Sequence, residues 1–257
     1  MYSMNRFIPL VFLFAMNFTY GEILKVEIDG VIDPITAEFI GESVMEAEQS
    51  EAEFLLILMQ TPGGLGISMQ EIIQTILNSK VPIVCYVSPR GAHAASAGFF
   101  ILLSADVAAM APGTNTGAAH PVFPFGMENE IMLEKVKNDA VANLRSIVKV
   151  RKRNYELAEK GVLESKSYTS QEALDGGLID LIAEDEEELL EKLEGLEITR
   201  FDGTTQVLSV KNQPIRLVEM NLRQEILSSI ADPNLALILG VIGVLGLYLE
   251  FTHPGLI

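Results

Sequence analysis

The chain alternates short apolar runs with amphipathic segments over most of its length. Residues 54–59 form a continuous apolar run, which is typical of a strand covered on both faces of a sheet. Residues 66–78 instead place apolar side chains at helical spacing. Strands separated by helices pair in parallel, because each helix crosses over to the next strand. We therefore predict an α/β domain with strands at 23–29, 54–59, 81–87, 107–111 and 178–183, and helices at 34–49, 66–78, 96–104, 128–160 (broken near Asn154) and 170–175.

Both ends of the chain favour a membrane. Residues 1–20 combine one positive charge with an apolar run, which indicates a signal peptide or N-terminal anchor, the alternative being a buried strand. Residues 235–249 are uncharged and apolar; as a helix they would span about 22 Å, short of the roughly 30 Å hydrocarbon core. The alternative there is a buried or interfacial helix. We expect the chain to have four parts. Residues 1–21 form a leader or anchor, and residues 22–195 form the main domain. Residues 196–233 form a small β-rich juxtamembrane segment with a helix, and residues 234–257 form an incomplete membrane region with a C-terminal membrane helix.

Charge and cysteine content exclude several kinds of site. The net charge of −17 argues against a nucleic-acid partner, because phosphate binding needs clustered Lys and Arg. The single cysteine, Cys85, excludes an internal disulfide and a multi-cysteine metal site. Its place in an apolar strand predicts a buried thiol. We expect neither a cofactor nor a metal.

Ser96 is the residue that most strongly suggests chemistry. It is a lone hydroxyl among the small residues 91–98, where a predicted strand gives way to an apolar helical run. A serine at a helix start has backbone N–H groups and the positive end of the helix dipole beside it, which suits a developing oxyanion. Gly63 and Gly64 follow another predicted strand and can bring a second backbone N–H close to a ligand. Together these elements predict an oxyanion hole, and hence acyl transfer.

A base that activates Ser96 could be a histidine. The chain has three histidines. His93 lies three residues before Ser96, His120 lies in the Gly- and Pro-rich segment 113–127, and His253 lies near the C-terminus. A serine nucleophile needs its base within hydrogen-bond reach. Neither His93 nor His120 has a spacing that predicts such a contact, so a histidine base is possible without being indicated.

A lysine is the other candidate for the base. Its pKa would have to fall by about three units, worth about 4 kcal/mol, which partial burial can supply. Lys135 and Lys137 both follow the Gly- and Pro-rich segment 113–127, which is expected to form a loop over a cleft. Two residues apart, they diverge by about 200° around a helix, so only one can face the cleft. An idealised wheel favours Lys137, and either lysine could simply be solvated.

Seven segments, in order over nearly the whole chain, resemble the NfeD family of membrane-bound ClpP-class serine proteases. That family is related more distantly to signal peptide peptidase A and to the crotonase fold. The resemblance therefore implies a ClpP/crotonase-like spiral core of repeated ββα units. The segments are 61–64 (TPGG), 94–98 (AASAG), 110–117 (MAPGTNTG), 134–140 (EKVKNDA), 172–180 (EALDGGLID), 232–234 (DPN) and 252–255 (THPG).

The resemblance also implies roles for individual residues. It implies a Ser–Lys dyad of Ser96 as nucleophile and Lys135 as general base, with Lys137 as the second choice, and an oxyanion hole of the Gly64 and Ala97 N–H groups. It further implies cleavage of apolar segments of membrane proteins, with stomatin-like proteins as substrate or partner. The protease domain is then expected on the extracytoplasmic (periplasmic) side of the cell membrane, in a homodimer or larger homo-oligomer.

Two other functions fit the same fold. An acyl-CoA hydratase or isomerase would use the same pair of backbone N–H groups with glutamates as acid and base, but the signal-like N-terminus, the membrane run and Ser96 oppose it. A membrane scaffold that has lost activity is the other. Reaction of Ser96 with an active-site probe separates a scaffold from a protease.

Overall fold

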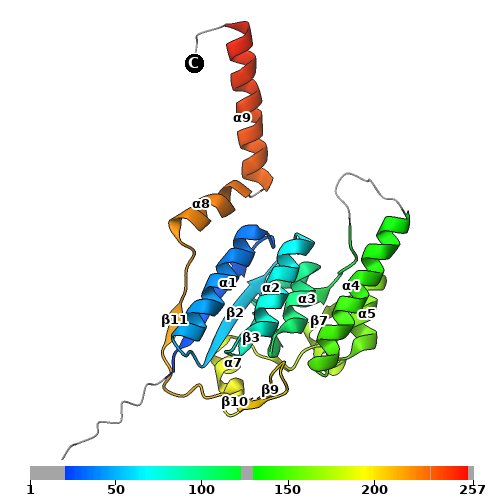
Figure 1. Ribbon diagram of the computed structural model, residues 1–257, viewed down its shortest axis with the longest axis vertical. Coiled ribbons are helices and arrows are strands. Elements are labelled where there is room, and N and C mark those ends of the chain that lie inside the picture. Colours follow the sequence, from blue (N-terminus) through cyan, green and yellow to red (C-terminus); the bar gives the residue numbers. More distant parts are fainter. Residues whose placement is uncertain (1–20, 123–129, 232, 254–257) are drawn as a thin grey trace, which may run out of the picture.

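A parallel sheet lies at the centre of the computed structural model, which describes residues 21–122, 130–231 and 233–253 (Figure 1). Its strand order is β11-β1-β2-β3-β5-β8, and all neighbouring pairs are parallel. The predicted α/β class is thus confirmed. The strand expected at 178–183 is shorter, because the N–H groups of Leu178 and Ile179 donate to Ala173 instead of to the sheet. The strands are β1 (Ile23–Asp29), β2 (Phe54–Gln60), β3 (Ile83–Val87), β5 (Val107–Met110), β8 (Leu181–Ile182) and β11 (Ile215–Leu217).

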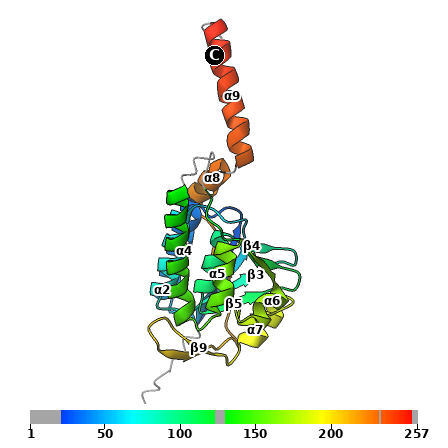
Figure 2. The same ribbon diagram turned by 90° about the vertical axis from the view of Figure 1, so that its right-hand side faces the viewer.

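Apolar cores cover both faces of this sheet. Helices α1, α2 and α3 pack on one face with α4 and α5 beside them, whereas α7 lies on the other (Figures 1 and 2). Alternate side chains of β2 serve the two cores, since Leu55 and Ile57 face α1–α3 and Phe54 and Leu56 face α7. Burial on both faces explains the continuous apolar run. The helices are α1 (Pro34–Gln49), α2 (Gly66–Asn78), α3 (Ala97–Ser104), α4 (Glu130–Val150), α5 (Tyr155–Leu163), α6 (Ser170–Asp175), α7 (Glu186–Leu193), α8 (Leu222–Ala231) and α9 (Pro233–Thr252).

A smaller sheet stands at the carboxyl ends of the main strands. It contains β4 (His93–Ala95), β6 (Asn115–Gly117) and β7 (Ser167–Thr169), in that order. Thr61, just after β2, forms a parallel bridge with Ala94 and so joins the two sheets. The sequence predicts neither β4 nor β6, because three residues are too few to show a strand period. Residues 115–117 of the segment expected to form a loop over the cleft therefore form the strand β6 instead.

The long helical region divides near the predicted break, between α4 and α5. Arg151 and Arg153 lie in the turn with buried guanidinium groups. Arg151 pairs with Asp106 at 2.6 Å, and Arg153 pairs with Asp180 at 2.5 Å. The side chain of Asn154 then caps α5 by accepting a backbone N–H. These contacts anchor α4 to the main sheet at its carboxyl end.

The residues after 195 return to the main sheet. β9 (Glu197–Thr199) and β10 (Thr205–Val207) form a hairpin whose Ile198 packs against α7, beneath it in the view of Figure 1. β11 then pairs in parallel with β1, with Ile215 opposite Ile23. The expected juxtamembrane segment is therefore joined to the domain by an edge strand, and α8 packs on α1.

The C-terminal helix α9 is longer than the apolar run predicts. Its 20 residues correspond to about 30 Å, which matches the hydrocarbon core of a bilayer. The helix extends beyond the apolar run at both ends. It begins at Pro233, because proline suits the first helical position, and it continues past Glu250 to Thr252. Within the described ranges, it is the one helix long and apolar enough to cross a membrane, with mean hydropathy 2.1 over Leu235–Thr252. It projects away from the domain (Figure 1). The predicted leader, except Gly21, and residues 123–127 of the predicted loop lie outside the described residues.

Candidate active site

Ser96 lies at the strand-to-helix turn between β4 and α3. Its φ of +53° and ψ of −112° are rarely adopted by residues other than glycine, at a cost of about 1–3 kcal/mol. Its N–H donates to the Gly117 carbonyl at 2.9 Å, which holds the turn from β6. The side chain is half-buried, so a substrate can reach it. A strained serine between strand and helix is an arrangement that presents a nucleophilic hydroxyl.

The segment after β2 comes directly against Ser96. The Thr61 N–H donates to the His93 carbonyl at 2.7 Å, and the Ala95 N–H donates to the Thr61 carbonyl at 3.0 Å. These bonds bring Gly63, with φ +111°, against Ser96. A Cβ on Gly63 would stand 2.5 Å from Ser96 Cβ and 3.0 Å from its Oγ, so only glycine fits. The structure thus brings together the two elements from which the sequence predicts an oxyanion hole.

Two backbone N–H groups near Ser96 are the candidates for an oxyanion hole, those of Gly64 and Ala97. The Ile32 N–H donates to the Gly63 carbonyl and the Leu65 N–H donates to the Ile32 carbonyl, both at 2.8 Å. In such a parallel bridge the N–H of Gly64 points away from Ile32, toward the other edge of the segment. Ala97 begins α3, where N–H groups have no acceptor within the helix and the dipole favours negative charge. Both groups can therefore donate to an oxyanion.

Gly117 and Thr61 support the site, although the sequence assigned them no role. A Cβ on Gly117 would lie 2.3 Å from the Lys166 carbonyl, so glycine is required where its own carbonyl holds Ser96. The Thr61 hydroxyl accepts the Gly63 N–H at 3.0 Å and so shapes the glycine turn. Both residues belong to Gly-containing segments that the family resemblance singles out, and that is the one signal that could have found them.

The two candidate lysines lie near the amino end of α4 and differ in exposure. Lys137 is half-buried, on the same face as the buried Val141 and Leu144, as the wheel predicts. Lys135 is exposed on the other side of the helix. In the single chain Lys137 is therefore less exposed to solvent than Lys135.

The histidines and Cys85 have other environments. Nδ1 of His120 lies 3.2 Å from the Val162 carbonyl, so this ring faces α5. His93 is half-buried in β4, and His253 is exposed at the end of α9. Cys85 is buried, as predicted, and burial raises the pKa of its thiol to about 12. Cys85 is therefore not a thiolate nucleophile at neutral pH.

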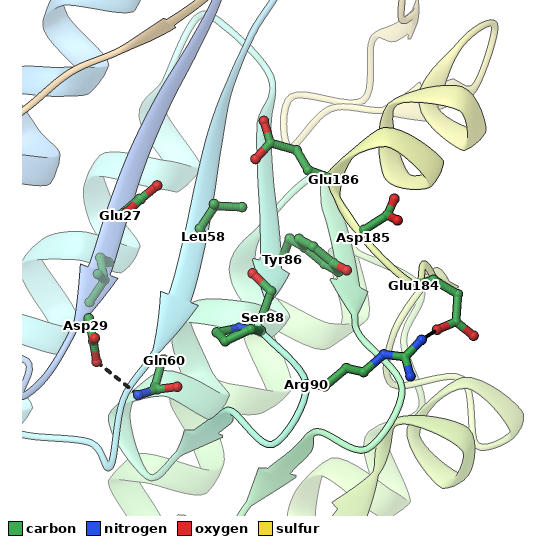
Figure 3. A pocket seen from close by; sticks show the side chains of 12 residues that line it. Glu27, Asp29, Leu58, Gln60, Tyr86, Ser88, Arg90, Glu184, Asp185 and Glu186 are labelled. Carbon is green, nitrogen blue, oxygen red and sulfur yellow. Dashed lines mark hydrogen bonds and ion pairs between the residues drawn. The ribbon is translucent and has the colours of Figure 1, made fainter.

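An acid-lined hollow of about 560 Å³ opens on the α7 side of the sheet (Figure 3). Glu27, Leu58 and Tyr86 stand in register on β1, β2 and β3 and line it. Polar side chains around it pair with one another, as Arg90 does with Glu184. The candidate nucleophile is not among its lining residues, so this hollow is separate from the candidate active site.

Known proteins with related sequences match most of the chain. The family model described as NfeD1b, N-terminal domain, matches residues 22–200. The chain belongs to the NfeD1b family. It is 34% identical over 251 residues to the membrane-bound protease PH1510 of Pyrococcus horikoshii, covering 96% of this chain and 57% of that protein. It is 28% identical over 232 residues to the membrane protein NfeD1b of Bacillus subtilis, covering 85% and 48%. The chain spans about half the length of these curated relatives.

Solved structures share the fold of this NfeD1b-family chain. One is the 1510-N membrane-bound stomatin-specific protease, in a lysine-to-alanine variant with a substrate peptide; its TM-score is 0.77 at 32% identity, covering 83% of this chain and 99% of that one. A serine-to-alanine variant of 1510-N has a TM-score of 0.73 at 33% identity, and the match covers 78% of this chain and 99% of that one. ClpP1 from Listeria monocytogenes, with a TM-score of 0.53 at 21% identity over 64% and 94%, shares the fold alone. The predicted family and ClpP-like fold are confirmed.

Proposed function

We propose that this chain is a membrane-anchored serine endopeptidase with Ser96 as nucleophile and Lys135 as general base. The geometry of Ser96 carries the proposal: a strained serine at a helix start packs against a glycine segment that offers a second N–H. Donors so placed stabilise the negative charge that develops during acyl transfer. The protease names of the relatives, and the solved variants with one serine or one lysine replaced, support the same assignment.

In the proposed mechanism the neutral amine of Lys135 accepts the proton of the Ser96 hydroxyl while Oγ attacks the peptide carbonyl carbon. The N–H groups of Gly64 and Ala97 donate to the resulting oxyanion. When the intermediate collapses, the C–N bond breaks, the lysine returns the proton to the leaving amine, and an ester to Ser96 remains. Water, deprotonated by the same lysine, then hydrolyses that ester.

The exposure of Lys135 sets a condition on this mechanism. An amine serves as a base near neutral pH only when apolar surroundings lower its pKa by about three units. The amino end of α4 must therefore be covered in the active state, by bound peptide or by a second copy of the chain. Its exposed Met132, one turn before Lys135, suits such a contact. We infer that a homodimer or larger homo-oligomer completes the site.

Alanine substitutions of the two lysines test the assignment of the base. Lys135→Ala is expected to lower kcat for an apolar peptide by about 10²- to 10⁴-fold, the usual contribution of a general base. Lys137→Ala is the matched control on the same helix and is expected to keep near wild-type kcat. Steady-state hydrolysis at saturating peptide measures both, with melting temperatures to show that each variant folds. The reverse pattern would assign the base to Lys137, and full activity in both would exclude Lys135 and Lys137 as the base.

The surface beside the oxyanion segment supports apolar substrates. Leu65 and Ile67 lie one and three residues after Gly64, are 54% and 74% exposed, and line a hollow of about 430 Å³. Covering such side chains with an extended apolar peptide gains about 25 cal/mol per Å² of apolar surface. We therefore propose apolar segments of membrane proteins as substrates. Stomatin-like proteins are the proposed substrate or partner, because 1510-N is named as stomatin-specific.

The apolar helix α9 and the composition of residues 1–20 support a location at a membrane. We propose that α9 spans the cell membrane and that the protease domain lies on its extracytoplasmic side. The signal-like composition of residues 1–20 supports that side.

A further inference from the structure

Helix α8 is attached to the domain by polar contacts. The buried side-chain amide of Gln224 donates to Glu42 at 3.0 Å and to Glu38 at 3.3 Å. Arg223 pairs with Glu38 at 2.5 Å. Both glutamates lie on α1, so hydrogen bonds and an ion pair hold α8 on that helix.

Three apolar side chains of α8 lie on the face directed away from the domain. Leu222, Ile226 and Ile230 recur every four residues and form one stripe. They are 72%, 51% and 48% exposed. Ile226 stands about 160° around the helix from the buried Gln224. A helix on the surface of a soluble protein normally has the opposite arrangement, with its apolar stripe toward the core.

The membrane is the apolar environment within reach of this stripe. α8 ends at Ala231, and the membrane-spanning window of α9 begins at Leu235. Four residues extend over at most about 14 Å, so α8 must stay close to a bilayer that α9 crosses. We propose that α8 lies in the membrane surface, with the stripe of Leu222, Ile226 and Ile230 inserted between lipid headgroups and acyl chains. The inference rests on the proposed membrane anchor and is independent of the proteolytic chemistry.

Apolar contact rather than charge drives this binding. The chain has a net charge of −17, and Arg223, the basic residue of α8, is paired with Glu38. Anionic lipids attract helices that are rich in Lys and Arg, which α8 is not. We therefore expect α8 to insert into uncharged phosphatidylcholine and to gain nothing from anionic lipid.

Fluorescence quenching in vesicles tests the proposal on the full chain, in the Ser96→Ala background to prevent self-cleavage. An environment-sensitive fluorophore is attached at Ile226→Cys on α8, at Leu245→Cys on α9, or at Glu187→Cys on the exposed surface of α7, at the far end of the domain (Figure 1). The native Cys85 is buried, so we expect it not to react with the fluorophore. Phosphatidylcholine with a nitroxide high on its acyl chain should quench the label at 226 at least about threefold more than the label at 187, as the depth of an interfacial helix requires.

A charge on the stripe provides a second readout. Ile226→Glu, at an exposed position, should reduce the lipid quenching of a label at Leu222→Cys and increase its quenching by aqueous iodide. Equal lipid quenching at 226 and 187, with deep quenching at 245, would overturn the inference while keeping the anchor. Loss of lipid quenching at 245 as well as at 226 would overturn both the inference about α8 and the proposed membrane anchor. Self-quenching at 226 that depends on protein density would show that a second copy covers the stripe, which also overturns the inference.

Discussion

Replacing Ser96 with alanine is expected to lower kcat for an apolar peptide by at least about 10⁴-fold, as removal of a serine nucleophile does elsewhere. The substitution removes only Oγ of a half-buried residue and leaves the Ser96 N–H bond to the Gly117 carbonyl in place. The melting temperature should therefore change little. Steady-state hydrolysis by the detergent-solubilised chain gives the measurement.

Ser88→Ala is the matched control for this substitution. Ser88 is also half-buried, but it lines the acid-lined hollow beyond β3 instead of facing Gly63. Its replacement should leave kcat unchanged. Undiminished hydrolysis by the Ser96→Ala chain would reject Ser96 as the nucleophile, and loss of activity in Ser88→Ala alone would move the site to the hollow.

Gly63→Ala is expected to lower kcat by about 10²- to 10³-fold. The new Cβ would stand 2.5 Å from Ser96 Cβ, and φ of +111° at this position strains any residue with a side chain. Ser96 or the segment that carries the Gly64 N–H must then move. A shift of about 1 Å in a reacting group can cost about 10²-fold, and a misplaced oxyanion donor costs more.

Gly66→Ala separates this effect from a general response of the segment. A Cβ on Gly66 would meet no heavy atom within 4 Å, and the residue begins α2, where alanine favours helix formation. This variant should keep wild-type kcat at saturating peptide and a melting temperature at least as high. Because Gly66 lines the same hollow as Leu65 and Ile67, any effect on substrate contact should appear in KM. Comparable activity of the Gly63→Ala and Gly66→Ala chains would show that the observed contact between Gly63 and Ser96 is not the catalytic arrangement.

Sequence patterns were sufficient for most helices and for the strands at the centre of the main sheet, and insufficient for the small sheet of β4, β6 and β7. The strands 54–59 and 107–111 and the helices over 34–49 and 66–78 were predictable, because each has enough apolar positions to show its period. β4 and β6 were not, because they depend on partners distant in the sequence. The contact of β11 with β1 likewise joins residues about 190 positions apart, which no local pattern reports.

The candidate site shows the same division. The approach of Gly63 to Ser96 was expected, because glycine pairs after a buried strand permit close backbone contact. The left-handed backbone of Ser96 could not be read from its identity, because the bond to Gly117 and the packing of Gly63 impose it. The choice between Lys135 and Lys137 depends on what covers the amino end of α4, and a helical wheel contains no information on a covering partner.

A covalent probe tests the central claim most directly. The full chain is incubated with a fluorophosphonate at neutral pH, and peptide mass spectrometry locates the adduct. An activated serine beside two oxyanion donors predicts one adduct per chain, on Ser96, formed much more slowly in the Gly63→Ala chain. Peptide hydrolysis that continues with Ser96 unlabelled, or an adduct confined to another residue, would contradict the account.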